Sequence, residues 1–248
     1  MNRNVKISVV TVCKNEAQTI ERTILSVVGQ TYRPVEYVLM DGQSTYGTLD
    51  VVGKYKDFCR LYSARDSGIY DAMNRGMAAA TGDYIIFINA GDYLIHQDVL
   101  VKCAAFISSA RDQFDVFYGN IFYYNPVTGA GWKWKPMRRT RLTMFMECLP
   151  HPATFFSRQA FDRNGLFDTS FQIAGDFEWF VRGMEKNHIR YGHVDTLVTL
   201  FHEGGVSTKS SYQNLHEAER ERIKKMHYSR RDRVLLNFGV FVKKNFHS

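Results

Sequence analysis

Short apolar runs rich in β-branched residues alternate with segments of helical spacing over the first 120 residues. Lys6 to Cys13 (KISVVTVC) is such a run, and it predicts a buried strand. The strands predicted in this part are 6–13, 35–40, 60–63, 84–88 and 114–118, and the predicted helices are 16–29, 48–57, 69–80 and 97–110. Strands that alternate with helices predict an α/β fold, with a parallel sheet between two layers of helices.

The pattern changes after about residue 120. Tyr123 to Trp134 contains an Asn-Pro pair and a Gly-Ala-Gly run, which predict a hairpin or a long loop. Basic and aromatic residues alternate from Trp132 to Lys135, and further arginines follow up to Arg141. The remaining predictions are a helix over 176–186, a strand over 196–201, a charged helix over 213–225 and an amphipathic segment over 230–246.

The composition is that of a soluble globular protein. Of the 248 residues, 45% are hydrophobic and 23% are charged, which excludes disorder, collagen and coiled coil as descriptions of the whole chain. The 4 cysteines are scattered without a C-x-x-C pair, so we expect reduced thiols in a cytoplasmic protein. The first apolar run breaks at Lys14 without a cleavage site, and 234–242 is too short to cross a bilayer.

Positive charge is concentrated at the end of the chain. The net charge is +7, and 219–248 contains nine Lys and Arg residues against three acidic residues. Because the rest of the chain is nearly neutral, we expect no nucleic acid partner, although a pI near 9.2 and the Trp132–Arg141 stretch keep that alternative open. The basic amphipathic segment predicts either attachment to an anionic membrane surface or a solvated helix packed on the domain.

Several acidic residues follow predicted strands or begin predicted helices. Asp41 could accept hydrogen bonds from a base or ribose, or could simply form a turn. Asp92 could hold Mg²⁺ or Mn²⁺, or cap the next helix. Asp176 could act as a general base, or cap the helix that it begins. His151 and His202 are lone histidines, which are more often structural than ligands, and neither phosphate-loop fingerprint occurs.

Taken together, four stretches resemble the family 2 glycosyltransferases, which have the GT-A fold. The matching stretches are 7–32, 35–48, 66–92 and the pair 151–158 with 174–182. Their order and spacing match over about residues 5–207, and the chain looks most like the bacterial branch that builds capsular and exopolysaccharides of the colanic-acid type. The resemblance implies a GT-A domain over 1–210, divided into a nucleotide-sugar half (1–120) and an acceptor half (121–210), followed by a basic helical tail over 211–248.

The resemblance also implies roles for individual residues. Asp176 matches the general base, Asp92 matches the metal-binding acid, and His202 is a second candidate metal ligand. The residues expected to bind the nucleotide-sugar are Thr11, Asn15, Glu16, Asp41, Asp66, Asn74, Asn89 and His151.

This chain departs from the family pattern at two positions. Asn89 stands where the family usually has an acid, which leaves one carboxylate for the metal. Gly175 stands where the family often has Glu, which removes a charge beside Asp176.

The implied activity is an inverting transfer of a sugar from a nucleotide-sugar donor to a saccharide or a lipid-diphosphate-linked saccharide. Mg²⁺ or Mn²⁺ is the expected cofactor, and the expected location is the cytoplasm, with peripheral attachment to the inner membrane through 219–248. Two other functions remain open: a non-catalytic nucleotide-sugar-binding subunit of a polysaccharide assembly complex, and a metal-dependent nucleotidyltransferase.

Overall fold

Strands and helices alternate at the start of the chain in the computed structural model, which describes residues 4–203 and 210–246. The first elements are β1 (Ile7–Cys13), α1 (Ile20–Val28), β2 (Val35–Asp41), α2 (Thr48–Gly53), β3 (Arg60–Ser63), α3 (Ile69–Ala79) and β4 (Tyr84–Phe87). They confirm the elements expected from the apolar pattern, except that the helix predicted over 16–29 begins at Ile20 and the helix predicted over 48–57 ends at Gly53.

The second part of the chain adds strands that run in both directions. Its first elements are β5 (Tyr93–Leu94), α4 (Val99–Ala110), β6 (Val116–Tyr124), β7 (Gly131–Trp134), α5 (Arg141–Met146), the 3₁₀ turn η1 (His151–Ala153) and β8 (Thr154–Ser157). The last are α6 (Arg158–Asn164), α7 (Gly175–Glu185), β9 (Tyr191–His202), the 3₁₀ turn η2 (Ser210–Tyr212), α8 (Gln213–His227) and α9 (Arg230–Phe246). The pair β6–β7 is the hairpin predicted for 123–134.

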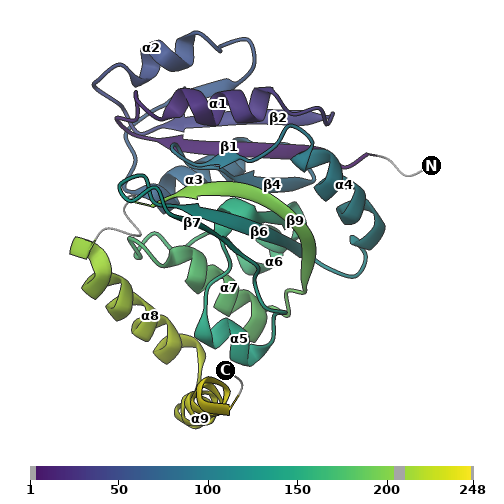
Figure 1. Cartoon of the computed structure of the whole chain (residues 1–248), viewed down its shortest axis with the longest axis vertical. Coiled ribbons are helices and arrows are strands. Elements are labelled where there is room, and N and C mark those ends of the chain that lie inside the picture. The colour runs from purple at the N-terminus through teal and green to yellow at the C-terminus, as the bar shows by residue number, and fades with distance from the viewer. Residues whose placement is uncertain (1–3, 204–209, 247–248) are drawn as a thin grey trace.

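One mixed sheet joins nine strands in the order β3-β2-β1-β4-β8-β6-β9-β5, with β7 paired to β6 (Figure 1). The first four strands of this order are parallel, as predicted, whereas β8 runs antiparallel to both β4 and β6. The sheet is therefore mixed: β8 interrupts the parallel order, and β6 and β9 again pair in parallel beyond it. The antiparallel β8 was not predicted, because it has only four residues (TFFS) and its two apolar residues are flanked by Thr154 and Ser157.

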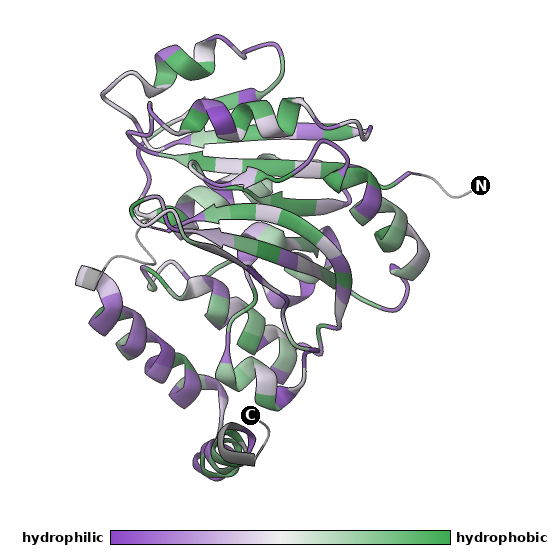
Figure 2. Cartoon of the chain, in the orientation of Figure 1, coloured by the Kyte–Doolittle hydropathy of each residue, from purple (hydrophilic) through white to green (hydrophobic). Residues whose placement is uncertain are grey.

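Two apolar layers cover the sheet. In one layer, α1 and α4 pack against one face of the sheet through residues such as Ile24 and Leu100. The other packs α3, α6 and α7 on the opposite face, through residues such as Met73, Phe161 and Trp179. Figure 2 shows the central strands as mostly hydrophobic, with a few polar positions, between these helices. Burial on both faces explains why β1 and β4 are rich in apolar residues and do not alternate between buried and exposed positions.

The last two helices pack on the second layer. α8 lies against α7, and α9 lies against α5. Ile223 of α8 and Tyr228, which directly follows α8, are buried in the core. Arg141 of α5 forms an ion pair of 2.9 Å with Asp232 of α9. No helix among residues 4–203 and 210–246 has both the length and the hydropathy that crossing a membrane requires.

Candidate active site

Asp41 lies at the carboxyl end of β2, where its carboxylate stabilises a turn. Oδ2 accepts hydrogen bonds from the backbone amide of Ser44 (3.0 Å) and the hydroxyl of Ser63 (2.6 Å), and Oδ1 accepts one from the Ser44 hydroxyl. Only 2% of Asp41 is exposed. The structure thus shows the turn-forming role, and the predicted contact with a base or ribose stays a prediction.

Asp66 lies beside this turn, next to Gly42. A Cβ at Gly42 would overlap with Asp66 Oδ2, so the absence of a side chain there lets the β3–α3 loop approach β2. An open depression near Asp66 is lined by Arg65, Asp66, Ser67, Asp71 and Arg75. The structure therefore places Asp41 and Asp66 together, as expected for two residues of one nucleotide pocket.

Three other residues predicted for this pocket form contacts within the protein. Thr11 has no exposed surface, and its hydroxyl donates to the Ile88 carbonyl (2.8 Å). Asn15 is exposed with a positive φ of 57°, and its side-chain oxygen accepts from the Thr45 amide (2.9 Å). Glu16 accepts a hydrogen bond from Thr19 (2.6 Å). Of these three side chains, that of Asn15 lies at the surface.

Asn74, also predicted for the pocket, fastens α3 to the loop before α7. Its amide nitrogen donates to the Phe167 carbonyl (2.9 Å), and its amide oxygen accepts from the Phe167 backbone amide (3.0 Å). Both ends of this side chain are thus engaged with one residue of the protein.

His151 connects the loop after β4 to the start of α7. Its Nε2 lies 3.1 Å from the amide nitrogen of Asn89, and its Nδ1 lies 3.1 Å from Oδ2 of Asp176. The structure thus brings together three residues that the sequence singled out at distant positions. The Asn89 side-chain oxygen is buried and has no hydrogen-bond partner among the described residues.

Asp176 lies at the N-terminus of α7, where hydrogen-bond donors surround its carboxylate. Oδ1 accepts hydrogen bonds from the Tyr70 hydroxyl (3.2 Å) and from the backbone amide of Phe177 (2.8 Å). Burial acts to raise the pKa of Asp176, but the hydrogen bond and charge of His151, together with these two donors, bring the pKa below its usual value. Asp176 is therefore ionised at neutral pH, as a general base must be.

The loop before Asp176 is anchored by Glu219 of α8. Its carboxylate accepts hydrogen bonds from three consecutive backbone amides, those of Gln172 (2.7 Å), Ile173 (3.0 Å) and Ala174 (2.8 Å). Glu219 is only 6% exposed. Sequence reasoning missed both Glu219 and Tyr70, because neither stands in a motif and their partners are distant along the chain.

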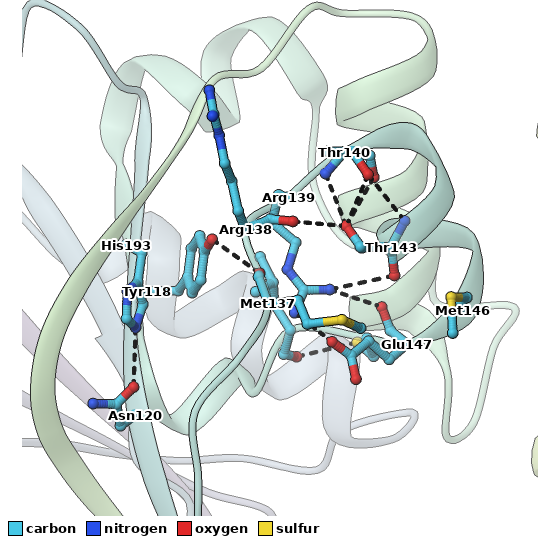
Figure 3. A network of polar contacts seen from close by, with 12 residues as sticks. Tyr118, Asn120, Met137, Arg138, Arg139, Thr140, Thr143, Met146, Glu147 and His193 are labelled. Carbon is cyan, nitrogen blue, oxygen red and sulfur yellow. Dashed lines mark hydrogen bonds and ion pairs between the residues drawn. The ribbon is translucent and has the colours of Figure 1, made fainter. Parts of the chain in front are cut away.

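The segment that leads to His151 is held by a second network, centred on Arg139 (Figure 3). The guanidinium forms an ion pair of 2.9 Å with Glu147 and donates to backbone carbonyls of α5 and its C-terminus. The Tyr118 hydroxyl donates to the Met137 carbonyl (3.3 Å), which ties this segment to β6. These contacts fix the path of the chain between the β6–β7 hairpin and His151.

Asp92 is buried at the end of the β4 loop. Its Oδ1 accepts a hydrogen bond from the backbone amide of His202 (3.2 Å). Burial raises the pKa of Asp92 to about 7, although the charges of His151 and Arg22 and the His202 amide act in the opposite direction. A carboxylate that is this costly to ionise gains from a bound cation.

The residues around Asp92 suit a hard divalent cation. Mg²⁺ is commonly held by one or two carboxylates and by substrate phosphates, and the unpaired oxygen of Asn89 is a ligand of the same type. The imidazole of His202 packs against Tyr93 and Tyr124, and its contact to Asp92 is made by the main chain. Within the described ranges, no group of three or more His, Cys, Asp or Glu residues is arranged to hold a metal.

Sequence comparison identifies relatives of this chain. The sequence model described as Glycosyl transferase family 2 matches residues 8–180. A Mycobacterium bovis protein named PGL/p-HBAD biosynthesis glycosyltransferase is 30% identical over 200 residues, which are 78% of this chain and 75% of that protein.

Solved structures with the same fold are more distant in sequence. S. aureus TarS 1-349 in complex with UDP-GlcNAc gives a TM-score of 0.68 at 20% identity, with 88% of this chain and 70% of that chain covered. In its UDP complex the match spans 60% of that chain. The mannosyltransferase PcManGT from Pyrobaculum calidifontis, in complex with GDP-Man and Mn²⁺, gives 0.63 at 15% identity over 98% and 82% of the two chains.

The structural matches show that the fold is the GT-A fold. The family model covers most of the chain, and the Mycobacterium bovis relative matches it over three quarters of its own length. The chain belongs to glycosyltransferase family 2.

Proposed function

We propose that this chain is an inverting glycosyltransferase that moves a sugar from a nucleotide-sugar to a hydroxyl group of a saccharide or of a lipid-linked saccharide. The observation that carries the proposal is the chain of contacts from Asn89 through His151 to Asp176. It joins the loop that ends in Asp92 to an ionised carboxylate held by Tyr70. A base beside a site suited to a donor diphosphate is what a direct displacement needs.

In the proposed reaction, Asp176 takes the proton of the acceptor hydroxyl as its oxygen attacks the anomeric carbon. His151 and Tyr70 orient the carboxylate and keep it ionised. The bond from the anomeric carbon to the diphosphate breaks with its electron pair on the leaving oxygen, so one displacement inverts the configuration. Asp92 and Asn89 are the residues that would hold Mg²⁺ or Mn²⁺, which offsets the negative charge of the diphosphate.

The relatives support a nucleotide-sugar donor and a divalent metal. Complexes of structural neighbours contain UDP-GlcNAc in one case and GDP-Man with Mn²⁺ in another. The relative named for PGL/p-HBAD biosynthesis supports an acceptor from cell-surface glycoconjugate assembly. We keep the capsule and exopolysaccharide branch as a prediction within that class.

Two variants separate the proton transfer from the binding of metal and donor. Asp176→Asn tests the base, and Asp92→Asn, which should remove the metal-dependent donor shift, tests the metal site. Purified protein is assayed by thermal shift with UDP-, GDP- and dTDP-sugars, with and without Mn²⁺ or Mg²⁺, and then for transfer. Asp176→Asn should keep the metal-dependent donor shift, but its transfer rate should fall by a factor of about 10² to 10⁴, which is the usual contribution of a general base. If Asp176→Asn transfers sugar at the wild-type rate, Asp176 is not the base. If no donor shifts the wild-type protein, the non-catalytic alternative is favoured.

We also propose that α9 attaches the enzyme to an anionic membrane surface. One face of α9 packs on the domain through Leu236 and Val240. The opposite face exposes Val234 (62%), Leu235 (60%) and Phe238 (66%), and Arg230 and Arg231 lie exposed one turn before them. Apolar side chains next to arginines on a helix face suit the interface of an anionic bilayer.

A further inference from the structure

Four aromatic side chains form a continuous group across β7, β6 and β9, and the proposed chemistry does not use them. Trp132 and Tyr123 are stacked, with ring centroids 5.2 Å apart and an angle of 15° between the planes. Trp134 and Phe201 also contact Tyr123, with ring centroids 6.2 and 5.4 Å from the centroid of the Tyr123 ring. We call these four residues the aromatic wall.

Strand register explains why these rings meet. Tyr123 of β6 lies directly opposite Trp132 of β7 on one side and opposite Phe201 of β9 on the other. Opposed residues of neighbouring strands point to the same face of a sheet, and Trp134, two residues from Trp132, points there as well. The wall is therefore built on paired strands rather than on a loose loop.

The wall adjoins the proposed active site. Phe201 directly precedes His202, whose backbone amide binds Asp92. Burial raises the pKa of the Tyr123 hydroxyl, and the charges of Cys148, Asp176 and Asp92 act in the same direction. Figure 1 shows the β6–β7 hairpin and the end of β9 at the same edge of the molecule as the end of β1.

The wall lies on the side of the site away from the nucleotide. In the order of strands, Asp41 on β2 lies on one side of β4, and β6, β7 and β9 lie on the other. Asn89 and Asp92 follow β4, between the two groups. A molecule that contacts the wall would therefore approach Asp176 from the side opposite to Asp41 and Asp66.

The exposed surface of Trp132 indicates what could bind. Tyr123 covers one face of the indole, and 48% of Trp132 remains exposed to solvent. An exposed aromatic plane provides a large apolar contact that loses little conformational entropy on binding. A pyranose ring has an apolar C–H face that fits such a plane, while its hydroxyl groups stay at the edge for hydrogen bonds.

We propose that Trp132, supported by Tyr123, is the acceptor subsite, where a sugar ring of the acceptor stacks and presents its hydroxyl to Asp176. The proposal rests on the transferase function proposed above. The stacked sugar supplies the attacking oxygen. That oxygen bonds to the anomeric carbon as the bond to the diphosphate breaks, and its proton passes to Asp176. Trp132 positions the acceptor and takes no part in the proton transfer.

The test compares Trp132→Ala with Trp132→Phe in the full chain. The donor is the nucleotide-sugar that gives the largest thermal shift, and the acceptors are a set of methyl and p-nitrophenyl glycosides. Trp132→Ala should raise the acceptor KM about tenfold, which corresponds to the loss of about 1.4 kcal/mol of binding free energy. The donor affinity should change by less than about twofold. Trp132→Phe should restore most of the acceptor affinity.

Val127→Ala is the matched control, because Val127 is 91% exposed at the turn of the same hairpin. It should leave both the acceptor KM and the donor affinity unchanged. A Trp132→Ala variant that keeps the wild-type acceptor KM, or that loses donor affinity in parallel, overturns the proposal.

A second measurement does not depend on turnover. Saturation-transfer NMR with the methyl glycosides should show binding to the wild type and to Val127→Ala, and reduced binding to Trp132→Ala. If no donor is transferred but the glycosides still bind in a Trp132-dependent way, the transferase proposal fails and the sugar subsite stands. If no glycoside binds to the wild type, the subsite proposal fails, whatever the donor assay shows.

Discussion

The ring of Tyr70 occupies the space that a side chain at Gly175 would need. A Cβ at position 175 would lie 2.7 to 2.9 Å from three atoms of this ring. From that position the Tyr70 hydroxyl donates to the Ile173 carbonyl (2.6 Å) and contacts Asp176 Oδ1 (3.2 Å). The absence of a side chain at Gly175 therefore has a physical role, because it makes room for the tyrosine that contacts Asp176.

Gly175→Ala tests this relationship. The added methyl group must displace the Tyr70 ring, and overpacking of this kind typically costs about 1–3 kcal/mol. We expect a lower Tm and a lower transfer rate, with the donor affinity retained. Gly53→Ala is the matched control, since nothing lies within 4 Å of a Cβ at that position. Equal stability of Gly175→Ala and the wild type would contradict the packing argument.

Tyr70→Phe keeps the ring and removes only the hydroxyl. Because the Tyr70 hydrogen bond helps to lower the pKa of Asp176, its loss should raise that pKa. The base acts in its ionised form, so transfer falls as the pH drops through the pKa, and the acidic limb of the kcat/KM profile should move to higher pH. A rate profile of the variant between pH 4 and 8 gives the answer. An acidic limb at the wild-type position would show that the hydroxyl does not act on the base.

Glu219 is predicted to position Asp176 without contacting substrate. Glu219→Gln keeps one acceptor oxygen for three backbone amides, and unpaired buried donors cost about 1–3 kcal/mol each. We expect a lower kcat and a lower Tm, while the donor KM stays unchanged because no contact of Glu219 is with a residue near Asp41. Glu217→Gln, exposed on the same helix, is the control and should behave as the wild type. A raised donor KM in Glu219→Gln would contradict a purely positioning role.

Periodicity predicted the first half of the fold well because each of its strands is a separate apolar run. The edges of β1 and β3 agree with the prediction within one residue. β6 and β9 are longer than predicted. The additional residues of β6 include polar and aromatic ones that pair with β7 and β9, and the additional residues at the start of β9 pair with the start of β6. Such pairing depends on distant partners, which local periodicity does not contain.

The candidate site was predictable where a residue ends a strand or begins a helix. Asp41 ends β2 and Asp176 lies in the first turn of α7, whereas Asp92 lies in the loop between β4 and β5 and was a candidate because it follows a buried strand closely. His151 was a candidate, but its two contacts, to Asn89 and Asp176, became visible only in the structure. Tyr70 and Glu219 act through contacts across 106 and 45 to 47 positions of the chain, so no local pattern could reveal them.

Asp92→Asn should stabilise the ligand-free protein while it removes metal-dependent donor binding. The pKa of Asp92 is raised to about 7 in the folded state, above its value near 3.9 when unfolded. The native protein therefore loses stability as the pH rises from about 4 to 7, and above 7 the loss is constant. The variant should gain up to about 4 kcal/mol at pH 8 and almost nothing at pH 4.

Thermal unfolding of both proteins across this pH range, without metal, measures the effect. The control is the same series with Asp195→Asn, since Asp195 lies at the surface and its pKa is lowered. That variant should gain no stability at pH 8. An Asp92→Asn protein that is less stable than the wild type at pH 8 would show that the ionised carboxylate is favourable in the native state.

The exposed face of α9 makes a prediction about membranes that can be separated from catalysis. The full chain should bind vesicles that contain phosphatidylglycerol and not vesicles of phosphatidylcholine alone. Each arginine near an anionic surface contributes about 1 kcal/mol, and the apolar side chains add burial in the interface. Replacing Val234, Leu235 and Phe238 by serine should therefore weaken binding by tenfold or more. Because α9 contacts the domain through its other face, transfer to a soluble glycoside should be unchanged.

The control is Met226→Ser, because Met226 is an exposed apolar residue of α8. Equal binding of the triple variant and the wild type would show that α9 does not enter the bilayer, and loss of transfer to the soluble glycoside would show that this face supports the fold instead.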